Sequence, residues 1–221
     1  MIAPLQPFAI RGVIWYQGES NRQDVPLYAK LFPQLIADWR SAWNQPELPF
    51  LFVQIAPFNG IPPELRAVQT QTWQHTPGTA MVVITDHGAA NDIHPTAKEP
   101  VGKRLALAAR AIAYKEKIVY SGPLVQRATF AQGRVSLAFK FSENGLISQP
   151  NEASLRGFSL AGADGKFVEA TARIVGNGVE VQAEAVPQPQ RVRFGWSNVP
   201  NVNLFNRKLL PAVPFDIEVS R

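Results

Sequence analysis

Two loop segments of this chain hold residue types that could together carry out acyl-transfer chemistry. The first, Gln17–Asn21, presents an amide, a glycine, a carboxylate, a hydroxyl and a second amide in succession. The second contains Asp92 and His94. A histidine beside a carboxylate can act alternately as base and acid because its pKa lies near neutrality. The side-chain amide of Gln17 could donate an N–H group to the oxyanion that develops when an ester is attacked.

Each of these residues also has a purely structural interpretation. Gln17 and Glu19 could do no more than hydrogen-bond the loops around them, and His94 could be a surface histidine ahead of a helix. His75 and His87 have fewer neighbours in the sequence that could take part in catalysis, and they are interpreted as structural. No His-x-x-x-His or Glu-x-x-His pair falls on a predicted helix, and the chain has no cysteine, so we expect no metal and no cofactor.

Short strands and longer helices must position these loops. Three short apolar runs with little polar alternation are typical of strands covered on both faces, and they occupy residues 9–16, 49–56 and 80–85. Helical spacing is found between and after them, in residues 27–43, 62–74 and 98–115. This order predicts a three-layer α/β fold with a parallel sheet. Ligands of such sheets bind beyond the carboxyl ends of the strands, and the loops of Gln17 and His94 follow two of those ends.

The spacing also predicts which helix faces are apolar. In the first helical stretch the predicted stripe consists of Leu27, Leu31, Leu35, Ile36 and Trp39. Pro33 within it predicts a bend or a late start of the helix. In the last stretch the predicted stripe consists of Val101, Leu105, Ala108 and Ile112.

The second half of the chain has a different hydrophobic pattern. Alternating runs are separated by turn signals at Gln132-Gly133, Asn144-Gly145, Asp164-Gly165 and Asn177-Gly178. Such pairs favour hairpins because both residues tolerate positive φ, so this half is predicted to be a β-sandwich. The change in composition and the Gly-Pro break near Ser121–Pro123 place the domains at residues 1–121 and 122–221.

The composition excludes several classes of function. The 221 residues are 46% hydrophobic and 18% charged, which is ordinary for a globular protein. The net charge of +5 comes from scattered lysines and arginines, so we expect no nucleic-acid partner. No apolar run approaches the roughly 18 residues of a membrane helix, so we expect no membrane partner.

Several separated motifs resemble the sialate O-acetylesterase family of SGNH hydrolases over essentially the whole chain. They are "IRGVIWYQGESN", "LRAVQ", "NDIHPTAKEPVGKRLALAA", "LRGFSLAGADGKF" and "VRFGWSNVPNVNLFN". The resemblance implies a serine esterase that removes O-acetyl groups from sugars such as sialic acid. It also implies an incomplete flavodoxin-like three-layer domain followed by a β-sandwich domain. The family is suggestive of a secreted or periplasmic protein, but the sequence shows no signal peptide, so the localisation is left open.

The resemblance assigns roles to three residues. Gln17 corresponds to the family's side-chain oxyanion donor, and His94 corresponds to its general base. The carboxylate that orients the histidine usually stands three residues before it, where this chain has Asn91. We therefore expect Asp92 in that role, with Asp86 as the rival and a Ser-His dyad as a further alternative.

The family's nucleophilic serine lies in a Gly-Gln-Ser-Asn segment that this sequence does not contain. The chain is therefore expected to be the C-terminal portion of a longer esterase, nearly inactive alone, with the nucleophile supplied from elsewhere, for example by a separate chain. Ser20 is a weaker candidate because Arg22 stands where a nucleophile elbow has its final glycine. A sheet that lacks its first strand would have an uncovered edge, which predicts oligomerisation or low solubility.

An alternative of another class is a non-catalytic carbohydrate-binding or scaffolding protein. The β-rich half contains Phe194, Trp196 and Phe205, whose rings could stack on sugars. Binding of acetylated glycans without hydrolysis would distinguish this alternative from the esterase.

Overall fold

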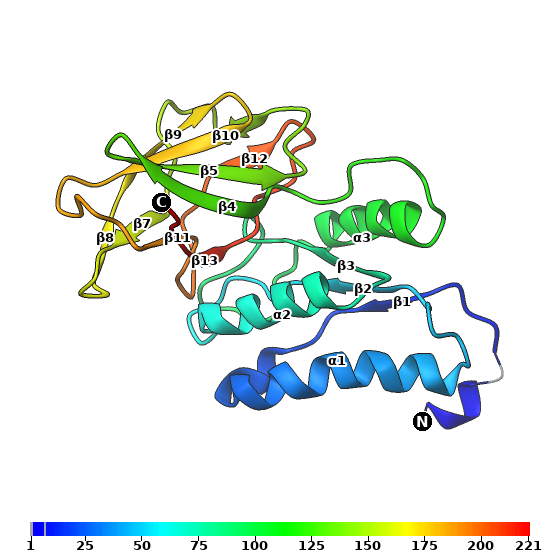
Figure 1. Cartoon of the computed structure of the whole chain (residues 1–221). Helices are drawn as coiled ribbons and strands as arrows, with labels where there is room; N and C mark the ends of the chain where they lie inside the picture. Colours follow the sequence, from blue (N-terminus) through cyan, green and yellow to red (C-terminus); the bar gives the residue numbers. More distant parts are fainter. Residues whose placement is uncertain (1, 7) are drawn as a thin grey trace. The chain divides into compact units, whose positions relative to one another are not determined.

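The computed structural model describes residues 2–6 and 8–221, and they form a mixed α/β structure (Figure 1). The chain divides into two compact units, of which one ends at Tyr120 and the other is Ser121–Arg221. Within the described residues, one sheet is parallel and three are antiparallel.

The unit that ends at Tyr120 is built on a parallel sheet with the order β1-β2-β3. These strands are β1 (Val13–Trp15), β2 (Phe50–Val53) and β3 (Thr79–Val82). Every residue of β2 and β3 is buried, which confirms for these two strands the prediction of coverage on both faces, whereas for β1 that prediction was wrong. The strands are shorter than the apolar runs that predicted them, because the ends of those runs continue into loops.

In the described part of this unit, three α helices and two short 3-10 helices accompany the sheet. They are η1 (Ala3–Leu5), η2 (Glu19–Gln23), α1 (Val25–Ala42), α2 (Pro63–His75) and α3 (Glu99–Ile112). Asp24 caps the N-terminus of α1 by accepting a hydrogen bond of 2.9 Å from the backbone N–H of Leu27. The helix starts at Val25 and continues through Pro33, so the predicted late start was wrong.

Helices cover both faces of the sheet, as Figure 1 shows with α3 on one side and α1 and α2 on the other. Phe32 of α1 meets the rings of Phe50 and Phe52 on one face of β2. Alternate residues of β2 point to opposite faces, so Leu51 and Val53 face the other way. They share an apolar cluster with residues of β3 and α3, namely Ala80, Val82, Val101, Leu105 and Ala108.

The buried stripe of α3 was predicted correctly at Val101, Leu105 and Ala108, and that of α1 was predicted correctly at Ile36 but not at Leu27 and Leu31. The side chains of α1 that are buried are Tyr28, Phe32 and Ile36, whereas Leu27 and Leu31 are 46% and 48% exposed. The ring of Phe32 provides the contact with β2, so the buried stripe begins one residue further along the helix than Leu27 and Leu31 indicate.

Strand β1 lies at the edge of the sheet and is poorly covered. In the described part of the chain it pairs with β2 alone. Ile14 is paired with Leu51 and therefore points to the face on which α3 packs, but α3 contacts β2 and β3. Ile14 is consequently 67% exposed. The uncovered sheet edge expected from the sequence is present.

The unit Ser121–Arg221 is built from antiparallel strands. One sheet has the order β4-β5-β10-β9, with strands Leu124–Ala131, Arg134–Lys140, Gly178–Gln182 and Thr171–Val175. A second has the order β13-β11-β7-β8, with strands Phe215–Glu218, Arg191–Phe194, Phe158–Ala161 and Phe167–Glu169. A short pair joins β12 (Leu204–Asn206) to β6 (Leu146–Ser148).

One apolar core serves both of the larger sheets. It receives alternate residues from each, among them Val135, Leu137, Val179 and Val181 from one sheet and Phe158, Leu160, Val192 and Phe194 from the other. Phe194 is 0% and Phe205 is 6% exposed. These two rings belong to the interior, so the idea that they stack on sugars was wrong.

The predicted hairpin turns have mixed outcomes. Gln132 and Gly133 have φ values of 51° and 76° and join β4 to β5, as predicted. Gly165 joins β7 to β8, also as predicted. The turn between β9 and β10 is Gly176-Asn177, one residue earlier than predicted, because Gly178 is already paired in β10. Gly145 forms no hairpin, since β5 and β6 on either side of it pair with other strands.

Candidate functional site

The candidate residues lie in the loops that follow β1, β2 and β3. Because the three strands are parallel, their carboxyl ends lie at one edge of the sheet. Gln17 follows β1, Asn59 follows β2, and Asp92 and His94 follow β3 before α3 begins at Glu99. The topology therefore brings the loops together, and side-chain contacts show how closely they meet.

The loops after β2 and β3 are joined directly. The backbone N–H of Asn59 donates to the carbonyl of Ala90 at 2.9 Å. The side-chain amide of Asn59 donates to Oδ1 of Asn91 at 2.7 Å. Gly88 lies so close to Pro57 that a Cβ atom on it would stand 2.5 Å from Pro57 Cδ. Only glycine leaves room for this approach.

The loop after β1 packs against α1 and the segment after β2. The Tyr28 hydroxyl donates to the carbonyl of Gln17 at 3.3 Å. A Cβ atom on Gly18 would lie 3.2 Å from Ile55 Cδ1, so the backbone there is in close contact with the neighbouring loop. The Gln17 amide donates through Nε2 to Oδ1 of Asn21 at 2.7 Å. Because a primary amide carries two N–H donors, one remains for another acceptor.

A buried polar network supports these loops from below. The backbone N–H of Ile55 donates to Oε1 of Gln69 at 2.8 Å. The amide of Gln54 donates to the carbonyl of Arg66 and to the hydroxyl of Thr70, at 3.2 and 3.0 Å. This network was not predicted from the sequence. Its signal was the set of polar residues within the apolar face of the helical stretch 62–74.

Tyr16 and Lys98 connect the loop of Gln17 to that of His94. Nζ of Lys98 lies 4.9 Å from the centre of the Tyr16 ring, within the range of a cation–π contact. Tyr16 directly precedes Gln17, and Lys98 stands four residues after His94. Burial, with a smaller contribution from Glu19, raises the pKa of Tyr16 to about 12. The phenol therefore stays protonated and neutral beside the lysine at neutral pH.

Asp92 contacts the backbone of His94. Oδ1 of Asp92 accepts a hydrogen bond of 2.8 Å from the backbone N–H of His94, a geometry that fixes the turn in front of α3. Both residues are exposed. Among the described residues, the imidazole of His94 makes no hydrogen bond or ion pair, and it has no direct hydrogen bond with Gln17.

Asp86, the rival of Asp92, is engaged elsewhere. Arg104 of α3 donates to both of its carboxylate oxygens, at 2.7 and 2.6 Å. Nε2 of His87 lies 3.3 Å from Oδ2 of the same carboxylate. Arg104 also donates to the carbonyl of Val83 at 2.7 Å, so it joins α3 to the end of β3. This role of Arg104 was not predicted from the sequence.

Ser20 lies in the 3-10 helix η2 and its side chain is exposed. Within the described part of the chain, its hydroxyl has no histidine or carboxylate partner. A nucleophilic serine requires an adjacent base for its activation. Nothing in the surroundings of Ser20 provides one.

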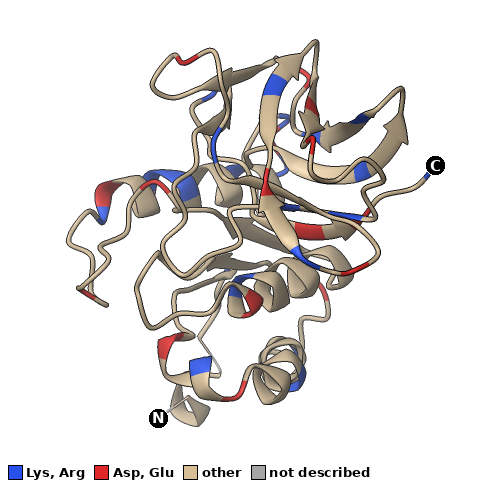
Figure 2. Ribbon diagram, turned by 90° about the vertical axis from the view of Figure 1, so that its left-hand side faces the viewer, with Lys and Arg blue, Asp and Glu red and all other residues tan. Residues whose placement is uncertain are grey.

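Residues 2–6 and 8–221 contain no group of three His, Asp or Glu side chains placed to hold a metal ion. The same residues contain no helix of sufficient length and hydropathy to cross a membrane. Basic and acidic residues are interspersed along the ribbon in Figure 2.

Comparison with a solved structure identifies the class of protein. The structure is similar to the crystal structure of a carbohydrate acetylesterase from Xanthomonas citri, which is described as novel. The two chains share 44% identity with a TM-score of 0.93, over 98% of this chain and 52% of that one. The architecture is therefore that of a carbohydrate acetylesterase.

Sequence comparisons identify the family. Residues 2–111 match the model described as carbohydrate esterase, sialic acid-specific acetylesterase. Sialate O-acetylesterase of Mus musculus is 38% identical in an alignment 152 residues long that covers 58% of this chain and 28% of that protein. The enzyme of Homo sapiens is 36% identical in an alignment of the same length that covers 58% of this chain and 29% of that protein. The chain belongs to the family of sialic acid-specific acetylesterases, and it spans less than a third of the length of these curated relatives.

Proposed function

We propose that this chain supplies the oxyanion-binding and acid–base residues of an esterase that removes O-acetyl groups from sugars. The family supports an O-acetyl ester hydrolase. The assignment of these roles to Gln17 and His94 rests on one observation. Tyr16 contacts Lys98, and this contact connects the loop of Gln17 to the loop of His94. The first unit then corresponds to an incomplete flavodoxin-like domain. The second corresponds to a β-sandwich, since its two larger sheets share one core.

The proposed reaction is acetyl transfer to a serine followed by hydrolysis. The serine Oγ attacks the acetyl carbonyl carbon while His94 takes the hydroxyl proton. The free N–H of the Gln17 amide donates to the oxygen that becomes negatively charged. The bond between the acetyl carbon and the sugar oxygen then breaks, and His94 returns the proton to that oxygen. Water releases acetate from the serine in the same way.

Asp92 has the role of a positioning residue in this proposal. Its carboxylate holds the backbone N–H of His94 at 2.8 Å and so fixes the turn from which the imidazole projects. Asp86 is the weaker candidate because Arg104 occupies both of its oxygens. A direct bond from Asp92 to the imidazole would need rotation of the aspartate side chain in the assembled site.

The serine is proposed to come from a polypeptide segment outside this sequence, for example from a separate chain. Two observations support this part. Ser20 has no base beside it among the described residues, and strand β1 presents an unpaired edge with Ile14 67% exposed. A segment that pairs with β1 would stand next to the loop of Gln17.

The test compares the purified chain with the chain produced together with the part of the Xanthomonas citri acetylesterase that lies outside the match. Hydrolysis of an aryl acetate and of O-acetylated sialic acid is measured. We expect little turnover from the chain alone and clear turnover from the pair. His94→Ala in the pair should reduce kcat about 10⁴-fold, and Gln17→Ala about 10²- to 10³-fold.

His75→Ala is the matched control, because His75 lies on α2 and its Nδ1 is 2.8 Å from the carbonyl of Gln71. It should leave turnover unchanged. Robust turnover by the chain alone that disappears in Ser20→Ala would refute the external nucleophile. Wild-type activity in His94→Ala would remove His94 from the mechanism.

A further inference from the structure

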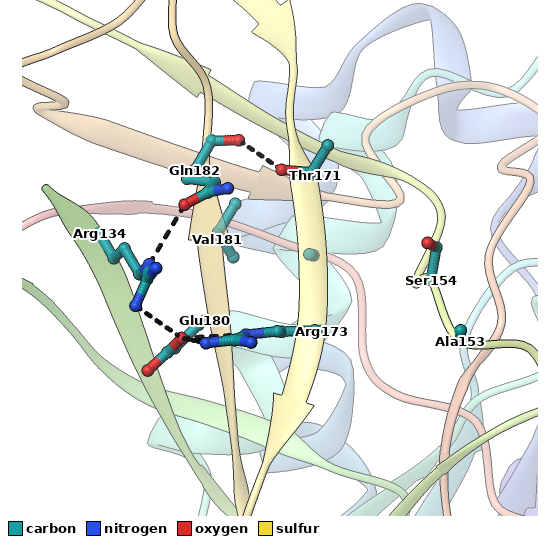
Figure 3. A pocket seen from close by; sticks show the side chains of 9 residues that line it. Arg134, Ala153, Ser154, Thr171, Arg173, Glu180, Val181 and Gln182 are labelled. Atoms are coloured by element: carbon teal, nitrogen blue, oxygen red, sulfur yellow. Dashed lines mark hydrogen bonds and ion pairs between the residues drawn. The ribbon is translucent and has the colours of Figure 1, made fainter.

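A pocket in the unit Ser121–Arg221 combines charged and hydroxyl side chains that the proposed esterase does not use (Figure 3). Its volume is about 370 Å³. Strands β5, β9 and β10 line it, together with a loop segment, Ala153–Ser154, that precedes β7. We propose that this pocket binds a sugar that bears a carboxylate, such as a uronic or sialic acid. The proposal does not depend on the proposed catalytic function.

The register of the strands explains why the polar side chains gather. Val181 in the middle of β10 is 0% exposed and points into the core, so Glu180 and Gln182 on either side of it point outward. Across the β9 pairing, Arg173 stands opposite Glu180 and Thr171 opposite Gln182. Residues directly opposite in neighbouring strands have their side chains in contact. The pocket therefore has a lining that is specified by the sheet.

The charges in this lining do not balance. Glu180 Oε2 accepts from Nε and Nη2 of Arg173, at 3.2 and 2.8 Å. It also lies 3.7 Å from Nη1 of Arg134. Nε of Arg134 donates to Oε1 of Gln182 at 3.2 Å. Two guanidinium groups thus share one carboxylate, and Figure 3 shows both arginines directed toward Glu180.

This arrangement leaves donors for an anion. Among the described residues, Nη2 of Arg134 and Nη1 of Arg173 donate no hydrogen bond. Glu152, which directly precedes the lining segment Ala153–Ser154, is paired with Arg156 and also accepts from the amide of Asn203. The lining itself contains two guanidinium groups and one carboxylate, an excess of one positive charge. A guanidinium matches a carboxylate in geometry because it offers two parallel N–H groups.

The remaining groups suit a sugar. Thr171 donates its hydroxyl hydrogen to the carbonyl of Gln182 at 3.2 Å, so its oxygen can accept from a ligand hydroxyl. The amide nitrogen of Gln182 and the hydroxyl of Ser154 add further hydrogen-bonding groups to the lining. No aromatic side chain lines the pocket, so recognition would rest on polar contacts. A volume of about 370 Å³ is at the lower end of the range for small-molecule sites and suits one sugar unit.

The experiment is a titration of the whole chain, followed by calorimetry and by NMR shifts of its backbone amides. Glucuronic acid and N-acetylneuraminic acid are the probes, and glucose and sodium sulfate are the comparison ligands. We expect saturable binding of at least one acid with a Kd of about 1 mM, and no saturation with glucose or sulfate in that range. Comparing the Kd values of the two acids shows whether the pocket prefers a uronic or a sialic acid.

Variants test the residues. The double variant Arg134→Gln/Arg173→Gln should raise Kd at least about tenfold, because it removes both guanidinium groups. Glu180→Gln should lower Kd, because it frees the N–H groups that Glu180 now occupies. Arg127→Gln is the matched control, since Arg127 is an exposed arginine of β4 in the same sheet outside the pocket. Thermal unfolding of each variant verifies that it is folded.

Several results would overturn the proposal. One is equal binding of sulfate and the acid sugars, which would show no more than a patch of positive charge. Others are equal weakening by Arg127→Gln and the double variant, weaker binding in folded Glu180→Gln, and no saturation by either acid. Esterase activity plays no part in these readouts, so the binding proposal and the proposed function can fail separately.

Discussion

Arg104 is the residue on which the loop after β3 depends most directly. Its side chain is 9% and that of Asp86 is 19% exposed, and two short hydrogen bonds join them. Arg104 also donates a hydrogen bond to the backbone carbonyl of Val83. Removing one member of such a pair leaves the other charge partly buried without its partner, which is costly.

Arg104→Met should therefore lower the free energy of unfolding by about 3 kcal/mol, because the Asp86 carboxylate would keep only His87 beside it. Urea denaturation followed by circular dichroism measures the change. Lys103→Met is the control from the same helix, because Lys103 pairs with Glu99 in solvent and should leave the unfolding midpoint where it is. Equal midpoints for Arg104→Met and the wild type would show that the pair is not structural.

The loops after β2 and β3 pack against each other at the end of the sheet, and a glycine makes this close contact possible. Gly88 faces Pro57 at a distance that excludes a side chain. Gly102 in α3 has open space instead, since a Cβ atom there would meet nothing within 4 Å. The two glycines therefore respond to the same substitution in opposite ways.

Gly88→Ala should destabilise the unit by about 1–3 kcal/mol, because the loops after β2 and β3 would have to separate. Gly102→Ala should stabilise it by about 1 kcal/mol, because alanine is the better helix former. Denaturant titrations of the two variants give both signs in one experiment. A stabilising Gly88→Ala would mean that the two loops are not in close contact in solution.

For the chain as a whole, the exposed apolar side chains are unevenly distributed. Among the described residues, seven of the ten large exposed hydrophobic side chains lie before Tyr120, namely Ile2, Leu5, Phe8, Ile14, Leu27, Leu31 and Tyr114. Ile14 belongs to the uncovered edge strand β1. Exposed edges with apolar side chains favour pairing with another chain.

We expect the purified chain to self-associate in a concentration-dependent way and Ile14→Lys to weaken that association. Lysine on an edge strand disfavours strand pairing because its charge would have to be buried. Sedimentation velocity over a range of protein concentrations measures the effect. Val199→Lys adds the same charge in the other unit, where Val199 is 38% exposed, and should change little. A wild-type chain that stays monomeric at every concentration would contradict the expectation.

Prediction from the sequence succeeded where the signal was local. The buried stripe of α3 follows from the spacing of Val101, Leu105 and Ala108, and the turn at Gln132-Gly133 follows from residues that accept positive φ. It failed where packing decided among similar residues. Leu27 and Leu31 have the spacing of a buried stripe, but the rings of Tyr28 and Phe32 occupy the contact with β2.

By itself, the sequence determined the order of the elements and the family resemblance, because periodicity, turn residues and motifs are properties of neighbouring residues. It also located Gln17 and His94 after two predicted strands. Only the tertiary structure decided which groups those loops contact: Asp86 meets Arg104, Asp92 meets the backbone of His94, and Tyr16 meets Lys98. These contacts depend on how loops and helices approach one another in space, and a carboxylate beside a histidine in sequence does not specify the atom that it will bond.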